Sequence, residues 1–213
     1  MPLTIYFLRH GQTHGSKENK FCGSGLDIDL TPEGEEMARQ FAAFYSSKPW
    51  TAVYCSPMRR ALATAKPLCE KLGIEPKRFE GLKEIAYGKW EGLTVEDAKR
   101  DFHDSYIRWS VDPAWNGADG GESAVDVERR AMPAVDEIAK QYTDGNVLVV
   151  SHKATIRIIL CSLLGIDLGR FRQRLECPVA SVSVVEFRAQ GPMLLSLADR
   201  THMTAELRNL AGT

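Results

Sequence analysis

The chain has 213 residues, 44% hydrophobic and 26% charged, which suits one globular domain with a substantial core. Its 27 lysines and arginines nearly balance 28 acidic residues, giving a formal net charge of -1 at pH 7. This balance excludes a general nucleic-acid surface and a polybasic membrane surface, but it leaves room for a small cationic pocket.

The cysteines and the N-terminal segment indicate where in the cell the protein is expected to be. The five cysteines are scattered and form no C-x-x-C pair, so neither a zinc site nor a disulfide framework is predicted. An apolar run begins at Leu3 without a basic segment before it, which is unlike a signal peptide. All apolar runs are far shorter than the ~18–20 residues that span a bilayer. We therefore expect a cytoplasmic protein with free thiols.

The first part of the chain alternates strands with helices. Residues 4–8 predict a buried strand. A helix is expected to begin after Thr31, a typical N-cap residue that a proline follows. Residues 52–55 predict a second strand. Residues 56–72 predict another helix, capped by the Ser-Pro pair at its start and stopped by Gly73.

The last part continues this rhythm. Residues 147–150 are almost wholly apolar, as a central parallel strand should be. After Ser151-His152 the sequence predicts a helix that continues through Leu164 and is ended by Gly165. Residues 181–187 and 193–197 predict two late strands joined by a Gly-Pro turn.

The middle of the chain, about residues 83–121, differs from both ends. It carries three of the four tryptophans and only short helical patterns. We interpret it as an insertion over the carboxyl edge of the sheet, within a single domain of residues 1–213. The predicted fold class is α/β, a three-layer αβα arrangement with a mostly parallel sheet.

Three predicted strands end in residues suited to phosphoryl transfer. Arg9-His10, Ser56 to Arg60 and Ser151-His152 follow three strands, and ligands bind beyond the carboxyl ends of such strands. Guanidinium groups match phosphate oxygens, a neutral imidazole can attack phosphorus, and a protonated second imidazole can stabilise charge. A carboxylic acid is then needed to protonate the leaving oxygen.

Six motifs carry a family resemblance along nearly the whole chain. They are Leu8-Arg9-His10-Gly11-Gln12-Thr13, Asp29-Leu30-Thr31-Pro32-Glu33-Gly34, Ser56-Pro57-Met58-Arg59-Arg60-Ala61 with Thr64-Ala65, Leu82-Lys83-Glu84 with Gly88-Lys89-Trp90-Glu91-Gly92, Gly120-Gly121-Glu122-Ser123, and Val149-Val150-Ser151-His152. In this register the sequence resembles the histidine phosphatase superfamily, which includes the cofactor-dependent phosphoglycerate mutases. The resemblance implies a phosphoglycerate mutase-like fold in which the insertion forms a small cap.

The resemblance also implies roles for five residues. His10 becomes phosphohistidine, while Arg9, Arg60 and His152 surround the phosphate with positive charge. Glu84 acts as general acid toward the leaving oxygen and then as the base that activates water, with Glu91 and Glu122 as alternatives in neighbouring loops. The family needs no metal, and no cofactor is expected.

Substrate-binding candidates flank these residues: Ser16, Cys22, Gly23, Lys153 and Ala154. Ser16 stands where many relatives have Asn, and Lys153 stands where the second histidine is commonly followed by Gly. Cys22 and Gly23 lie in a segment that resembles a substrate-lining loop, with a surface turn as the alternative. Lys153 is expected either to contact a substrate carboxylate or to point away along the helix.

The first functional hypothesis is a metal-independent phosphomonoesterase acting on a small phosphorylated metabolite such as phosphoserine, phosphoglycerate or a sugar phosphate. A phosphoglycerate mutase is the second, disfavoured because no additional basic substrate loop follows Glu84. A non-catalytic phospholigand-binding module is the third, although it has no chemical need of His10 and Glu84 together. No nucleic-acid or membrane partner is expected, and a homodimer through the late strand pair is left open.

Overall fold

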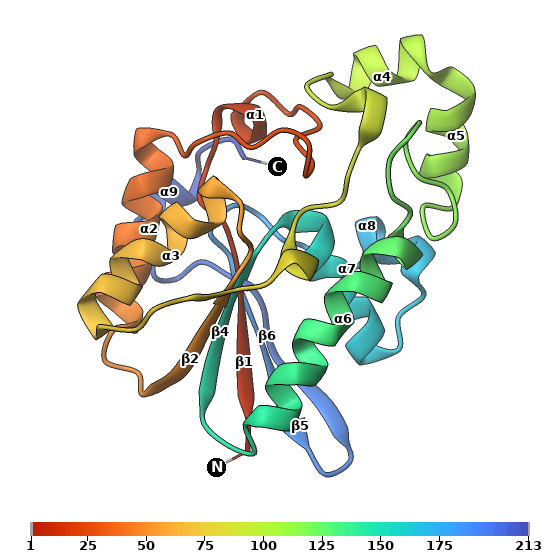
Figure 1. Cartoon of the computed structure of the whole chain (residues 1–213). Coiled ribbons are helices and arrows are strands. Elements are labelled where there is room, and N and C mark those ends of the chain that lie inside the picture. Colours follow the sequence, from red (N-terminus) through yellow and green to blue (C-terminus); the bar gives the residue numbers. More distant parts are fainter. Residues whose placement is uncertain (1, 213) are drawn as a thin grey trace.

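The computed structural model describes residues 2–212 and contains one six-stranded sheet with helices on both faces (Figure 1). The predicted domain of residues 1–213 extends one residue beyond this range at each end. The strands are β1 Thr4–Arg9, β2 Trp50–Cys55, β3 Lys77–Arg78, β4 Asn146–Ser151, β5 Val182–Arg188 and β6 Gly191–Asp199. The helices are α1 His14–Lys17, α2 Pro32–Tyr45, α3 Arg59–Leu72, α4 Val95–Asp101, α5 His103–Val111, α6 Ala124–Gln141, α7 Lys153–Leu164, α8 Phe171–Arg174 and α9 Ala205–Arg208, with 3-10 turns at Glu80–Leu82, Gly88–Trp90 and Leu168–Arg170.

The strand order is β3-β2-β4-β1-β5-β6, and the mostly parallel sheet predicted from the sequence is confirmed. Neighbouring strands pair in parallel from β3 to β1, whereas β5 is antiparallel to both β1 and β6. Arg9 at the end of β1 lies opposite Ser151 at the end of β4, and Cys55 at the end of β2 lies opposite Val150. The residues that follow these three strands therefore emerge side by side at one edge.

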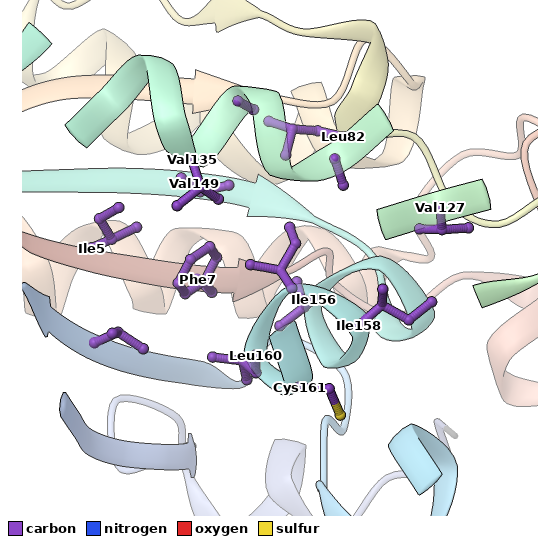
Figure 2. Packing of buried hydrophobic residues seen from close by; sticks show 14 of the residues in the cluster. Ile5, Phe7, Leu82, Val127, Val135, Val149, Ile156, Ile158, Leu160 and Cys161 are labelled. Atoms are coloured by element: carbon purple, nitrogen blue, oxygen red, sulfur yellow. The ribbon is translucent and has the colours of Figure 1, made fainter. Parts of the chain in front are cut away.

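Both faces of the central strands β1 and β4 are buried, which explains their nearly continuous apolar sequences. Alternate β1 residues point to opposite faces: Ile5 and Phe7 pack with α6 and α7, whereas Tyr6 and Leu8 pack with α2 and α3. Figure 2 shows Ile5, Phe7 and the β4 residue Val149 between Val135 of α6 on one side and the labelled side chains of α7 on the other. The three-layer αβα arrangement is thereby confirmed.

Most predicted helix ends agree with the structure. The Thr31 hydroxyl accepts from the Gly34 amide at 3.0 Å and caps α2, and Gly73 and Gly165 end α3 and α7 with left-handed φ angles of 66° and 67°. The predicted start of α3 at the Ser56-Pro57 pair is wrong. The helix begins at Arg59, because the Ser56 hydroxyl is occupied by the Met58 amide and the ring of His152.

The 83–121 segment folds into short helices beyond the carboxyl ends of the strands (Figure 1). Its aromatic centre consists of Trp90 and Trp109, which pack edge-on at 5.3 Å and both contact Phe21. The limits of the insertion stay a prediction. None of the helices formed by residues 2–212 combines the length and apolarity needed to cross a bilayer.

His202 has a packing role at the far side of α2. Its ring lies 5.5 Å from that of Phe41 and 5.8 Å from that of Tyr45, and neither of its nitrogens has a hydrogen-bond partner within the described residues. Burial lowers the pKa of His202 to about 4. The unfolded chain therefore binds this proton at a higher pH than the folded chain, and stability is lost as pH falls from about 6.5 toward 4.

We expect His202→Phe to weaken this acid sensitivity. The fall in free energy of unfolding between pH 7 and pH 4 should shrink by up to about 3 kcal/mol, measured by urea unfolding at both pH values. The measurement at pH 7 serves as the control, since it reports any packing effect of the larger ring alone. If the free energy of unfolding of the variant falls as much between pH 7 and pH 4 as that of the wild type, His202 titrates alike in the folded and unfolded chains.

Candidate active site

A cavity of about 150 Å³ lies where the strand ends meet the 83–121 segment. Eight of the ten predicted site residues line this cavity, and His152 and Gly23 do not. The residues that line it are Arg9, His10, Thr13, Ser16, Asn19, Lys20, Phe21, Cys22, Arg60, Glu84, Tyr87, Val95, Trp109, Lys153, Ala154, Arg157, Phe171 and Arg172.

His10 follows β1 directly and is held in one tautomer. Its Nδ1 lies 2.8 Å from the Gly11 carbonyl oxygen, which can only accept, so Nδ1 carries the proton and Nε2 carries the lone pair. Burial, followed by the charges of Arg60 and Arg9, holds the pKa of His10 well below 6.5. The imidazole is therefore neutral near pH 7, with its Nε2 available as a nucleophile.

Arg60 is 1% exposed and connects His152 to the 22–26 loop. Its Nε donates to His152 Nδ1 at 3.2 Å, and its terminal nitrogens donate to the carbonyls of Leu26, Cys22 and Gly23 at 3.0, 3.2 and 3.1 Å. These bonds use four of the five N–H groups of the guanidinium, and Nη1, which carries the fifth, lies 3.6 Å from a carboxylate oxygen of Asp27. Arg60 thus contributes mainly a fixed positive charge beside the cavity.

The geometry of His152 differs from the expected protonated donor. Because Nδ1 accepts from Arg60, Nε2 carries the proton and donates to the Ser56 hydroxyl at 2.8 Å. Burial and the charge of Arg60 hold the pKa of His152 well below its usual value. His152 is therefore neutral with both nitrogens engaged, and its ring centroid lies 5.1 Å from that of His10. The positive charge around the cavity comes from arginine and lysine.

Glu84 is fixed against the first turn of α7. One carboxylate oxygen accepts from the backbone N–H groups of Ile85 at 2.9 Å and Thr155 at 3.2 Å, and the other accepts from Ala154 at 3.2 Å. A helix N-terminus provides such amide donors and a favourable dipole for an acidic side chain. Glu84 is 5% exposed and lines the same cavity as His10.

Arg130 of α6 positions the loop that carries Glu84. Its guanidinium forms a two-pronged ion pair with Glu122 at 2.7 and 2.8 Å and donates to the carbonyls of Gly81, Lys83 and Glu84. Glu122 in turn accepts from the Ala86 amide at 2.8 Å. Glu122, which the sequence offered as an alternative general acid, therefore has a structural role and does not line the cavity. Glu91 has a structural role too, because it accepts from three backbone amides.

Of the five predicted substrate-binding residues, four line the cavity. Lys153 is among them, so it does not point away from the site. The Ser16 hydroxyl donates to the Thr13 carbonyl and accepts from the Thr13 amide, both at 2.9 Å, which leaves it little capacity for phosphate. Gly23 lies outside the lining because its carbonyl accepts from Arg60 and its amide donates to Glu91.

Several cavity residues were missed from the sequence. Arg157 was detectable, since it follows Lys153 by four positions in a predicted helix and so shares its face. Arg172 and Tyr87 gave no local signal. Of the three tryptophans in the 83–121 segment, Trp109 lines the cavity. Across residues 2–212, no group of three or more His, Cys, Asp or Glu side chains is arranged to hold a metal ion.

Comparison with known proteins agrees with this geometry. Residues 5–200 match the family described as "Histidine phosphatase superfamily (branch 1)". The chain is 29% identical over 201 residues to phosphoserine phosphatase 1 of Hydrogenobacter thermophilus, covering 94% of each protein. It is 32% identical over 174 residues to the glucosyl-3-phosphoglycerate phosphatase of Mycolicibacterium vanbaalenii, covering 78% of this chain and 76% of that relative.

A solved structure supports the same assignment. That of YhfR from Bacillus stearothermophilus superimposes with a TM-score of 0.87 at 26% identity, covering 94% of this chain and 98% of that one. The family match, the relatives named as phosphatases and the shared fold support one family assignment. The chain belongs to the histidine phosphatase superfamily.

Proposed function

We propose that this protein hydrolyses small phosphomonoesters without a metal ion, through a phosphohistidine formed on His10. One observation carries the proposal: a neutral His10 with its Nδ1–H anchored shares a cavity with Arg9, Arg60 and Glu84. These groups supply a nucleophile, fixed positive charge and a proton carrier, the three components that phosphoryl transfer from an ester requires.

The first transfer forms the phosphoenzyme. The phosphate enters with its non-bridging oxygens toward Arg9 and Arg60, and His10 Nε2 attacks phosphorus in line with the ester oxygen. The P–N bond forms as the P–O ester bond breaks, and Glu84 in its carboxylic-acid form gives its proton to the leaving alkoxide. The Nδ1–H donation to the Gly11 carbonyl stabilises the positive charge that develops on the imidazole.

The second transfer regenerates the enzyme. Glu84, now a carboxylate, accepts a proton from a water molecule whose oxygen attacks phosphorus. The P–N bond breaks, its electron pair returns to Nε2, and inorganic phosphate leaves. Arg9 supports both steps because, apart from one bond to the Cys177 carbonyl at 2.8 Å, its guanidinium keeps its donors for a ligand.

Two relatives support hydrolysis over mutase activity, since both are named as phosphatases of small metabolites. Arg9 supports a mechanism without a metal ion. Burial lowers the pKa of Arg9 to about 10, and because this is still well above 7 the group stays charged at neutral pH. Fixed guanidinium charge can stabilise the transferring phosphoryl group in the manner of a metal ion.

A phosphoenzyme trap tests the proposal. The protein is mixed with 3-phosphoglycerate in excess EDTA, and quenched samples are analysed by mass spectrometry while free phosphate is measured. We expect undiminished phosphate release and an acid-labile phosphoryl group on His10. Accumulation of 2-phosphoglycerate in place of free phosphate would identify a mutase. Loss of activity in EDTA, restored by a divalent ion, would overturn the metal-independent mechanism.

A further inference from the structure

A second cationic cluster lies in the same cavity, apart from the residues assigned to phosphoryl transfer. Lys153 and Arg157 stand one turn apart on α7, and Arg172 belongs to α8. Within the described part of the chain, none of the three forms an ion pair, and none of their side chains donates a hydrogen bond to a protein acceptor. The three charges are therefore available to a ligand.

Arg157 is the strongest indication of a missing partner. It is 8% exposed, and its Nε is buried without a hydrogen bond. Arg130 shows the usual state of a half-buried arginine in this protein, because it is bound to a carboxylate and three carbonyls. Burial of an unpaired guanidinium is costly, and an anion bound beside it would offset that cost.

The other two cations are held in place around the same space. The Arg172 guanidinium carbon lies 3.7 Å from the ring centroid of Trp109, a cation–π contact that fixes the group while leaving its N–H donors free. Burial and the nearby charges of Arg9 and Arg157 lower the pKa of Lys153 to about 8. This crowding of like charges is what an anion would relieve.

The charge balance of the cavity requires more than one anionic group. Six cationic side chains line it among the described residues, and two of them already have carboxylate neighbours, because Lys20 pairs with Glu18 at 2.6 Å and Arg60 lies 3.6 Å from Asp27. The other four face the single lining carboxylate of Glu84. A phosphate dianion beside Arg9 and Arg60 leaves the cluster of Lys153, Arg157 and Arg172 uncompensated. Glu84 is assigned to proton transfer at the ester oxygen, and among the described residues the lining offers no second carboxylate to a substrate ammonium group.

We propose that Lys153, Arg157 and Arg172 form a second anion subsite that holds a carboxylate at the non-transferred end of the substrate. The inference rests on the proposed function and narrows its substrate class. Preferred substrates are small phosphorylated hydroxy acids, ahead of phosphorylated polyols, which lack the carboxylate, and phosphorylated amino acids, which add an ammonium group. The cavity volume of about 150 Å³ suits a compact metabolite.

A matched pair of esters isolates the contribution of the carboxylate. 3-Phosphoglycerate and glycerol 3-phosphate differ only by a carboxylate in place of a hydroxymethyl group. We expect kcat/KM to favour 3-phosphoglycerate by about 10- to 100-fold, the value of one or two charge-assisted hydrogen bonds. O-Phosphoserine should fall between them. Equal kcat/KM values for the pair would overturn the subsite.

Variants assign the preference to the cluster. Arg157→Gln and Arg172→Gln should each reduce kcat/KM for 3-phosphoglycerate by about tenfold and leave that for glycerol 3-phosphate within about twofold. A general loss of structure would lower both values together. Arg174→Gln is the control, since Arg174 is exposed on α8 outside the cavity. A preference for 3-phosphoglycerate that survives both substitutions would remove these arginines from the subsite.

Equilibrium binding separates this inference from the proposed function. Calorimetry with the His10→Asn variant measures the affinity for both esters when the nucleophile is absent. If the variant binds 3-phosphoglycerate more tightly in an Arg157-dependent way while the wild type hydrolyses neither ester, the hydrolase is rejected and the subsite is supported. Hydrolysis with equal affinity for both esters would reject the subsite and support the hydrolase.

Discussion

His10→Asn is expected to lower kcat/KM for phosphate esters by about 10⁴-fold or more, the scale of loss when a covalent nucleophile is removed. Asparagine can still donate to the Gly11 carbonyl, so the loop after β1 should keep its conformation. The variant lacks the Nε2 lone pair, and no phosphoenzyme can form. Steady-state phosphate release and mass spectrometry of quenched samples measure the two consequences separately.

His14→Asn is the matched control, because His14 is exposed and outside the cavity. Its kcat/KM should equal that of the wild type. Inorganic phosphate should still bind to His10→Asn, since Arg9 and Arg60 remain in place. Retention of more than a tenth of the wild-type rate by His10→Asn would exclude a phosphohistidine intermediate, whatever the family resemblance.

The central strands of the sheet were predictable because they are buried on both faces. β1 and β4 consist of nearly unbroken apolar runs, a pattern that few other structures produce. α6 was not predicted, although Ser123 and Asp126 form a capping box at its start. Its buried face is rich in alanine, which gives little contrast with the polar face, and Pro133 inside it reads as a helix breaker.

The candidate site also contains some residues that were predictable from the sequence and others that were not. Arg9, His10 and the residues after β2 and β4 were predictable because parallel strands end at one sheet edge. The neutral state of His152 was not, since it depends on Arg60 and Ser56 reaching its two nitrogens from another segment. Arg172 was equally hidden, because a tryptophan of the 83–121 segment holds it at the cavity.

These two groups of residues carry different parts of the chemistry. The motif residues at the strand ends include the groups that we propose for phosphoryl transfer. Arg157 and Arg172 lie outside these motifs, and both line the same cavity. A sequence motif therefore predicts the reaction type better than the substrate, since fold and core chemistry serve many phosphate esters.

The second large effect is expected at Glu84. Glu84→Gln keeps the shape of the side chain but removes its ability to give or take a proton. For 3-phosphoglycerate, whose alkoxide leaving group needs a proton, kcat should fall by about 10²–10⁴-fold, the usual contribution of one positioned acid or base. Affinity for inorganic phosphate should persist, because the arginines are untouched. Phosphate release and calorimetry check the two expectations.

An ester with a good leaving group separates the two steps of Glu84. p-Nitrophenolate leaves without a proton, so the variant should form the phosphoenzyme rapidly from p-nitrophenyl phosphate and then hydrolyse it slowly, giving a burst of one nitrophenolate per enzyme. Glu96→Gln, an exposed change on α4, should behave as the wild type. If Glu84→Gln shows neither the burst nor the leaving-group dependence, the proton carrier is another group.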